Sequence, residues 1–187
     1  MKGTEPMKGI KLIAATGAAC WLSGCASAPN FAIDQPVGPA PGSPVIASSH
    51  GYLEVYSAHR EEPITDNFTE WQRNYNVGRY PVAYELAHTS YIVRNGNGTI
   101  VEEVRNARNA NDPRPKRVAL PPGRYHVEAE AQGPGGPMMA VLLPVVIKPG
   151  KTTVAHLAGH WKPEVPFTDG EVIRLPDGQI AGWLAQP

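Results

Sequence analysis

The sequence predicts an all-β protein, an antiparallel sandwich of seven strands followed by a C-terminal β-hairpin. Three observations predict this fold class. Nineteen glycines and twenty prolines divide the 187 residues into short segments, which favours strands over long helices. Several segments alternate apolar and polar residues with a period of two, as strands with one buried face do. Asn-Gly and Asp-Gly turn signals separate pairs of such segments.

Seven segments carry the strand pattern. Residues 124–131 alternate most clearly, with apolar side chains on one face and mostly charged ones on the other. Residues 84–94 and 99–105 flank an Asn-Gly-Asn-Gly run, which predicts a hairpin. Residues 138–147 are apolar on both faces, so we expect a central strand there, with Pro144 at a bulge or an unpaired edge. The remaining strands are expected at 52–56, 116–120 and 152–157.

The C-terminal residues predict a further hairpin. Residues 171–175 and 179–184 flank Pro176-Asp177-Gly178, a tight-turn signal. An isolated two-stranded hairpin is only marginally stable in water. We therefore expect this one to dock on the sandwich through Trp183 and Ile180; a frayed tail is the alternative.

Two stretches add a family resemblance. The sequences LPPGRYHVEAEA at 120–131 and PVVIKPGKTTVAHL at 144–157 resemble the last two strands of carboxypeptidase-regulatory or transthyretin-like domains of bacterial surface proteins. The resemblance covers residues 116–157 well and 51–57 as a first strand, and it implies an immunoglobulin/transthyretin-like sandwich. Residues 58–83 depart from it, being longer and more polar than a usual connection. Such domains are mostly non-catalytic modules with varied partners, so the resemblance says little about function.

The first 24 residues have the pattern of a leader. Three lysines precede an uncharged run of eleven residues from Leu12 to Leu22, which is signal-peptide length and far short of the ~20 residues that cross a bilayer. The run ends in Leu22-Ser23-Gly24-Cys25, which resembles the lipobox of bacterial lipoproteins. The resemblance implies cleavage before Cys25, acylation of that cysteine, and attachment to a membrane through the lipid.

Two other interpretations of the leader stay open. The Ala26-Ser27-Ala28 sequence would let ordinary signal peptidase release a soluble protein, although Pro29 would then follow the cut. Cys20 is the other candidate for acylation, but Gly17 stands where a lipobox has Leu. If Cys25 is acylated, the resemblance implies a cell-envelope protein, and the Ala that follows favours the outer membrane of a Gram-negative bacterium.

The chain is therefore expected to have four parts. Residues 1–24 form the signal peptide, 25–49 the lipidated Cys25 with a Pro/Ala-rich tether, 50–159 the sandwich, and 160–187 an extension with the hairpin. Five prolines and little apolar surface predict that the tether stays extended.

Composition excludes several functions. Without residues 1–24 the chain carries two more acidic than basic residues, which gives no footprint for nucleic acid. With Cys20 removed and Cys25 acylated, no thiol is left for a disulfide, a thiolate metal site or a nucleophile. The sequence calls for no cofactor.

The histidines give weak metal patterns. His156 and His160 have the helical ligand spacing, but in a strand residues four apart are separated by ~13 Å, too far to share one ion. His126, Glu128 and Glu130 share one strand face, where neighbouring members have the right chemistry for a hard ion. A solvated polar face explains the same pattern, and we expect no metal at either place.

Catalysis has little support in the sequence. The chain has no G-x-S-x-G elbow. Asp66, Glu70, Glu102 and Glu103 are candidate paired carboxylates, but sequence alone does not bring them together across a cleft. We expect no enzyme activity.

The segment 58–83 is the most suggestive of binding. Phe68, Trp71 and Tyr75 are spaced three and four apart, as on one face of a helix, and Arg73 and Tyr80 lie nearby. Aromatic rings and arginine are common interface anchors, and long loops on rigid scaffolds often bind. The alternative is that these rings cover an open edge of the sandwich.

The sequence thus predicts a lipid-anchored, non-catalytic envelope protein that binds or helps to assemble an envelope protein partner. The alternative is a module that binds a glycan such as peptidoglycan, because aromatic platforms also stack on sugar rings. A hydrolase that uses loop 58–83 is the weakest alternative.

Overall fold

The computed structural model describes residues 31–63, 84–106 and 114–187, and these are all-β with one short 3-10 helix. The sheets are mixed, whereas the sequence predicted an antiparallel fold, and the described residues form thirteen strands instead of the seven of the sandwich and two of the hairpin. No helix in the described ranges is long and apolar enough to cross a membrane. The strands are β1 (Phe31–Ala32), β2 (Val37–Gly38), β3 (Gly51–Tyr56), β4 (His59–Pro63), β5 (Tyr84–His88), β6 (Tyr91–Asn95), β7 (Ile100–Val104), β8 (Val118–Leu120), β9 (Gly123–Gln132), β10 (Met138–Ile147), β11 (Thr152–His156), β12 (Val172–Arg174) and β13 (Ile180–Leu184), with η1 at Asp169–Glu171.

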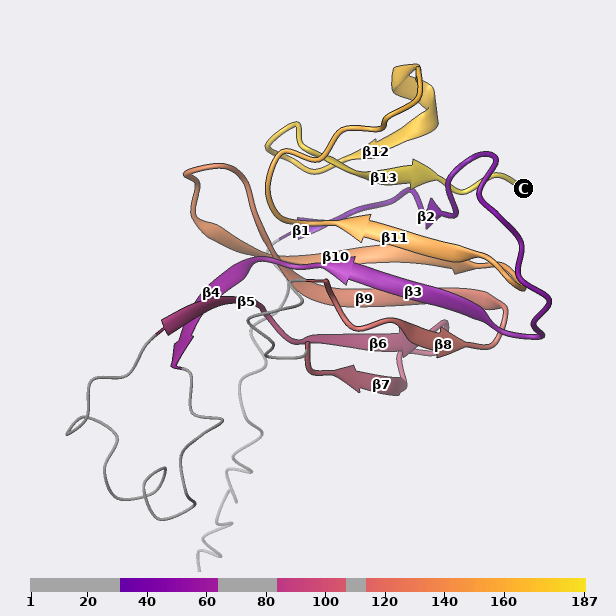
Figure 1. Ribbon diagram of the computed structural model, residues 1–187, viewed down its shortest axis with the longest axis horizontal. Coiled ribbons are helices and arrows are strands. Elements are labelled where there is room, and N and C mark those ends of the chain that lie inside the picture. Colours follow the sequence, from indigo (N-terminus) through magenta and orange to yellow (C-terminus); the bar gives the residue numbers. More distant parts are fainter. Residues whose placement is uncertain (1–30, 64–83, 107–113) are drawn as a thin grey trace, which may run out of the picture.

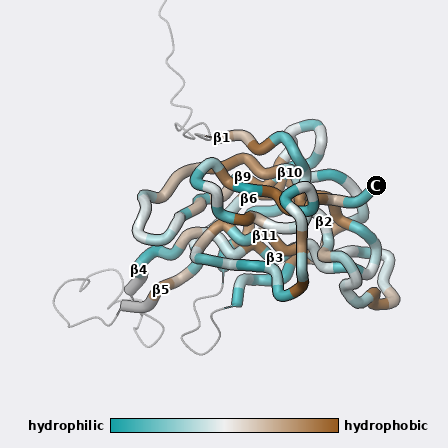
Figure 2. The backbone as a smooth tube through the Cα atoms, turned by 90° about the horizontal axis from the view of Figure 1, so that it is seen from above, coloured by the Kyte–Doolittle hydropathy of each residue, from teal (hydrophilic) through white to brown (hydrophobic). Residues whose placement is uncertain are grey.

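The strands form two facing sheets and a side ribbon. The larger sheet has the order β12-β13-β2-β10-β9-β6-β7, with β1 also paired to β10. The smaller sheet has the order β11-β3-β8, in which β3 and β11 run parallel. Figure 1 shows the smaller sheet in front of the larger one, and Figure 2 shows the same two layers from above. Strands β4 and β5 pair only with each other, beside the two sheets (Figure 1).

The core lies between the two sheets and is built by alternation. Along β9 every second residue is buried, and along β3 the inward residues Leu53 and Val55 are fully buried. Val127 on β9 and Leu143 on β10 meet them from the other sheet within one apolar cluster. The period of two predicted for 124–131 is therefore confirmed, because alternate side chains of β9 are buried in the core and the others lie on the outer face.

Pro144 interrupts neither β10 nor its register with β9. All ten residues of β10 pair with β9, with Pro144 opposite His126, so of the two expected arrangements the bulge is absent. The carbonyl of Leu142 accepts the Ile33 N–H on the other side of β10. Backbone groups two residues apart in a strand face the same side. The ring nitrogen of Pro144 therefore faces the gap between β1 and β2, which pair with β10 on either side of it. No carbonyl of a neighbouring strand needs a donor there, so the absence of an N–H has no cost.

The expected strand 84–94 is two strands. Strand β5 pairs with β4, outside the larger sheet. After a break at Thr89-Ser90, β6 pairs with β9 and β7 in the larger sheet. At the break the Thr89 N–H donates to the Ala58 carbonyl, and the Ala58 N–H donates to Glu130 on β9. These two bonds fix the point where the β4–β5 ribbon leaves the sheets.

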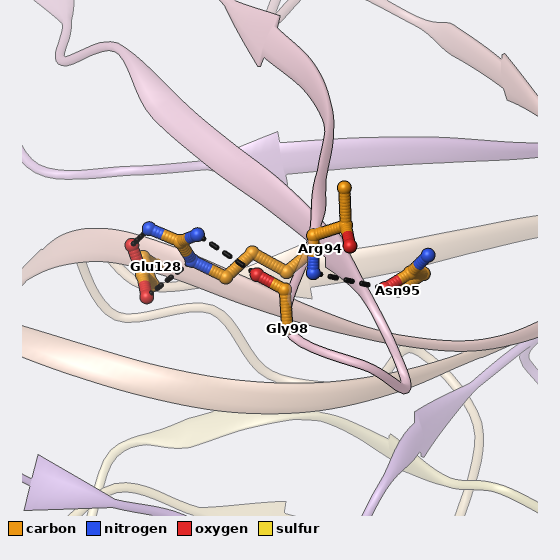
Figure 3. Close-up of polar contacts among 5 residues, drawn as sticks. Arg94, Asn95, Gly98 and Glu128 are labelled. Carbon is orange, nitrogen blue, oxygen red and sulfur yellow. Dashed lines mark hydrogen bonds and ion pairs between the residues drawn. The ribbon is translucent and has the colours of Figure 1, made fainter.

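The hairpin predicted at 95–98 is confirmed, and side chains fasten it (Figure 3). Gly98 has a φ of 80°, which the turn requires and glycine tolerates. The Asn95 Oδ1 accepts the backbone N–H of Asn97 and of Thr99. Arg94 donates to both carboxylate oxygens of Glu128, at 2.7 and 3.1 Å, and to the Gly98 carbonyl. The guanidinium therefore ties the turn to β9.

Residues 31–38 of the predicted tether at 25–49 are part of the folded domain. Strands β1 and β2 lie within it and pair in parallel with β10, and Val37 is fully buried. The Ile46 N–H also donates to the Gly150 carbonyl. These residues pair because the edge of β10 that faces away from β9 has backbone groups that need hydrogen-bond partners. The non-proline residues of a Pro-rich segment can still supply them.

The C-terminal hairpin forms, but it joins the larger sheet by strand pairing and does not dock on the main core through Trp183 and Ile180 as predicted. Strand β13 pairs with β12 on one side and with β2 on the other. Trp183, Ile180 and Val172 are buried in a small apolar cluster of their own, against which Trp161 and Phe167 pack. The residues after 159 therefore continue the sheet of residues 31–147.

Candidate ligand-binding site

A cavity of about 440 Å³ lies where three turns meet. Its walls are the β9–β10 turn at 133–137, the segment 160–162 after β11, and the β12–β13 turn at 177–179. Met139 and Ile180 contribute apolar surface from the strands beside the turns. We call it the Trp161 cavity. A concave, mostly apolar site with a few polar groups is the usual form of a small-ligand site.

Backbone hydrogen bonds hold these turns in place. The Gln132 N–H donates to the Leu157 carbonyl, and the Gly159 N–H donates back to Gln132, so the end of β9 fixes the segment after β11. In the β12–β13 turn, Gly178 has a φ of 85° and its N–H donates to the Leu175 carbonyl. The cavity is therefore built on a rigid frame.

The indole of Trp161 is fixed by a stack of rings behind it. The His156 ring lies 4.0 Å from the Trp161 ring with only 6° between the planes, and Tyr56 stacks on the other side of His156 at 4.8 Å. Burial lowers the pKa of His156 to about 4, so its imidazole is neutral at pH 7. Trp161 lines the cavity, so an indole held in place by His156 forms part of its apolar wall.

Gln179 also lines the cavity, and its side-chain amide is buried without a partner among the described residues. Its Nε2 and Oε1 atoms are both buried, and neither has a hydrogen-bond partner among the described residues. Gly133 makes room for the neighbouring Asp177, because a Cβ there would lie 2.5 Å from its carboxylate oxygen. A buried amide without partners costs roughly 1–3 kcal/mol, which a ligand would recover if the amide turned toward it and the ligand offered a donor and an acceptor.

The charged residues of the cavity lie at its rim. Arg174 donates to the Gly178 carbonyl and to Asp169, so it braces the turn. Asp177 accepts the Gln179 N–H through Oδ1. Lys162 is exposed. The interior is therefore apolar and amide-lined, which suits a neutral polar ligand with one apolar face.

The binding residues predicted from the sequence lie outside the described residues. These residues are Phe68, Trp71, Arg73, Tyr75 and Tyr80. Cys25 and the candidate carboxylates Asp66 and Glu70 also lie outside the described residues. Strand β4 ends at Pro63 and β5 begins at Tyr84, and these two residues pair. The described residues on either side of this segment, Pro63 and Tyr84, therefore lie side by side.

The metal and carboxylate candidates that the structure does describe have other partners. Glu128 pairs with Arg94 and Glu130 with Arg60, so two members of the predicted His126 face are held by arginines. His156 is stacked between rings, and His160 lies at the cavity rim. Glu102 lies 4.0 Å from Lys116. Glu103 is on β7 opposite Ile92.

Sequence reasoning missed Trp161 and Gln179 because the turns that bring them together are far apart in the chain. The Pro176-Asp177-Gly178 signal located the turn but not what it faces. No protein-family model, curated protein or solved structure matches this chain. The Trp161 cavity is therefore the basis for the function proposed below.

Proposed function

We propose that this chain is a lipid-anchored, non-catalytic binding module of the cell envelope, and that it holds a cell-wall glycan in the Trp161 cavity. One observation carries the proposal: the same cavity is lined by an indole that a ring stack holds in place and by Gln179, whose buried amide has no partner among the described residues. We further propose that the two sheets belong to the immunoglobulin/transthyretin-like type.

A sugar ring fits both features. One face of a pyranose carries C–H groups, which pack on an indole, and its rim carries hydroxyls that donate and accept hydrogen bonds. If it turns toward the cavity, the Gln179 amide would offer one acceptor and two donors to such a rim. A site whose polar groups stay unpaired without the ligand also discriminates against analogues that lack a matching hydroxyl.

The proposed anchor would keep the cavity close to the membrane. If Cys25 is acylated, residues 26–30 alone separate the lipid from β1, which begins at Phe31. Five extended residues span about 17 Å. A glycan layer next to the membrane, proposed to be the outer membrane, would then lie within reach of the domain.

The test is the affinity of soluble cell-wall glycan fragments for the wild-type protein and two variants, by titration calorimetry. Trp161→Ala is expected to weaken binding at least tenfold, or about 1.4 kcal/mol, because it removes the platform. Gln179→Met is expected to weaken binding and to raise the free energy of unfolding by about 1 kcal/mol without ligand, since it removes the unpaired amide.

Tyr52→Ala is the matched control. Tyr52 is also a half-buried aromatic residue of the smaller sheet, but it lies four residues from Tyr56 along β3, about 13 Å away, and does not line the cavity. Equal binding by Trp161→Ala and the wild type would contradict the proposal. Absence of glycan binding, with a protein retained from envelope extracts instead, would favour the protein-partner alternative.

A further inference from the structure

Two histidines that are distant in sequence face each other on the β4–β5 ribbon. His59 and His88 are directly paired in the antiparallel ladder, and their ring centroids lie 4.2 Å apart with a tilt of 33°. Both side chains are half-buried. The Tyr56 ring meets His88 edge-on at 5.6 Å. This pair is separate from the Trp161 cavity and does not depend on the function proposed for it.

The tautomer of His88 follows from its hydrogen bond. Its Nδ1 lies 2.6 Å from the Ser57 carbonyl oxygen. A carbonyl only accepts, so Nδ1 carries the proton and the lone pair is on Nε2. Histidines that bind metals through Nε2 commonly donate Nδ1–H to a backbone carbonyl, which fixes the ring and makes it more basic.

The carbonyl that holds His88 is itself in a rigid place. Ser57 is fully buried, and its hydroxyl donates to the Thr89 carbonyl at 2.6 Å. The side-chain amide of Asn106 donates to the same carbonyl at 2.9 Å. The Thr89 N–H returns a bond to Ala58. The imidazole of His88 is therefore presented from a braced strand junction.

The surroundings of His59 favour its neutral form. Burial, and then the neighbouring His88, lower the pKa of His59, so the charged form is disfavoured there. The nearest arginine along β4, Arg60, is engaged with Glu130 at 3.1 Å. Neutral imidazoles are the form that binds a metal ion.

We propose that His59 and His88 form a two-imidazole site for a divalent transition metal ion. The two rings are directly paired and 4.2 Å apart, so one ion would reach both imidazoles, at the ~2.0–2.1 Å of Zn²⁺–imidazole bonds, once the rings turn out of their tilted stack. The described residues contain no group of three or more His, Cys, Asp or Glu side chains arranged for a metal. Water or an external ligand would fill the remaining positions, and the Irving–Williams order predicts that Cu²⁺ binds more tightly than Ni²⁺ or Zn²⁺.

The experiment titrates CuSO₄ or ZnCl₂ alone into the purified full chain by calorimetry. His59→Phe keeps a ring in the ribbon but removes a ligand, and it is expected to weaken Cu²⁺ binding at least tenfold. His126→Phe, on the outer face of β9, is the matched control and should bind as the wild type does. Equal Cu²⁺ affinity in His59→Phe and the wild type would overturn the proposal.

A second measurement uses the wild-type chain alone, so it does not depend on whether a variant folds. Ni²⁺ added in small amounts to the wild-type chain broadens the NMR signals of the imidazoles that bind it. The proposal predicts that the His59 and His88 ring signals broaden before those of the other four histidines. Broadening that begins at any other histidine would overturn it.

Discussion

His156, the middle ring of the stack behind the cavity, should make the stability of the protein depend on pH. Burial lowers its pKa from 6.5 to about 4. Between these values the unfolded chain binds more protons than the folded one, so stability is fully present above pH 6.5 and is lost as the pH falls through 4. At 1.36 kcal/mol per unit the loss is up to about 3 kcal/mol. Cation–π attraction from Trp161 offsets about 1 kcal/mol of this, so we expect about 2 kcal/mol.

His156→Phe isolates this contribution, because it keeps a stacked ring but cannot be protonated. The assay is urea unfolding of the wild type and the variant at pH 7, 5 and 4, with the difference between the two proteins taken at each pH. That difference should shift by about 2 kcal/mol in favour of the variant between pH 7 and 4. The His59 contribution is present in both proteins and cancels. A difference that stays constant with pH would refute the reasoning.

Two further predictions concern the frame of the fold. Tyr91 is 2% exposed and its hydroxyl has no hydrogen-bond partner among the described residues. Tyr91→Phe should therefore leave the free energy of unfolding unchanged or raise it by about 1 kcal/mol. A fall in the free energy of unfolding by more than about 1 kcal/mol, measured by urea unfolding, would show that the hydroxyl is bonded. Gly150 has a φ of 66°, and a Cβ there would collide with the Ile46 carbonyl. Gly150→Ala should therefore lower the free energy of unfolding by at least about 2 kcal/mol in the same assay. A decrease below about 1 kcal/mol would contradict the predicted strain.

The parts of the fold that the sequence predicted are those with a local signal. The alternation at 124–131 requires one buried face, and β9 at 123–132 has it. The glycines of the two Asn-Gly and Asp-Gly turns, Gly98 and Gly178, adopt the positive φ that such turns need. These features depend on neighbours within a few residues, which a sequence displays directly.

The parts that the sequence did not predict depend on distant partners. Strands β1 and β2 are two residues long, too short to show a period, and they form because β10 has an open edge. The break at Thr89-Ser90 has no Gly or Pro, and it is set by hydrogen bonds to Ala58 and Asn106. Alternation also continues on both sides of that break, so nothing in the chain signals that β5 changes sheet.

The candidate sites were hidden for the same reason. Aromatic residues near each other in sequence drew attention to 58–83, whereas Trp161 comes from a polar segment that is unremarkable as a sequence. His59 and His88 are opposite each other only because β4 and β5 pair. Strand pairing across long loops places side chains together with no spacing signal in the chain.

The most direct test of the account follows the indole N–H signals by NMR while soluble cell-wall glycan fragments are added. Trp161, Trp71 and Trp183 each give one such signal in the chain without its proposed leader. The account predicts that the Trp161 signal shifts and saturates with added glycan, while the signal of buried Trp183 moves little. A saturable shift of Trp71 alone, or no shift of Trp161, would contradict glycan binding in this cavity.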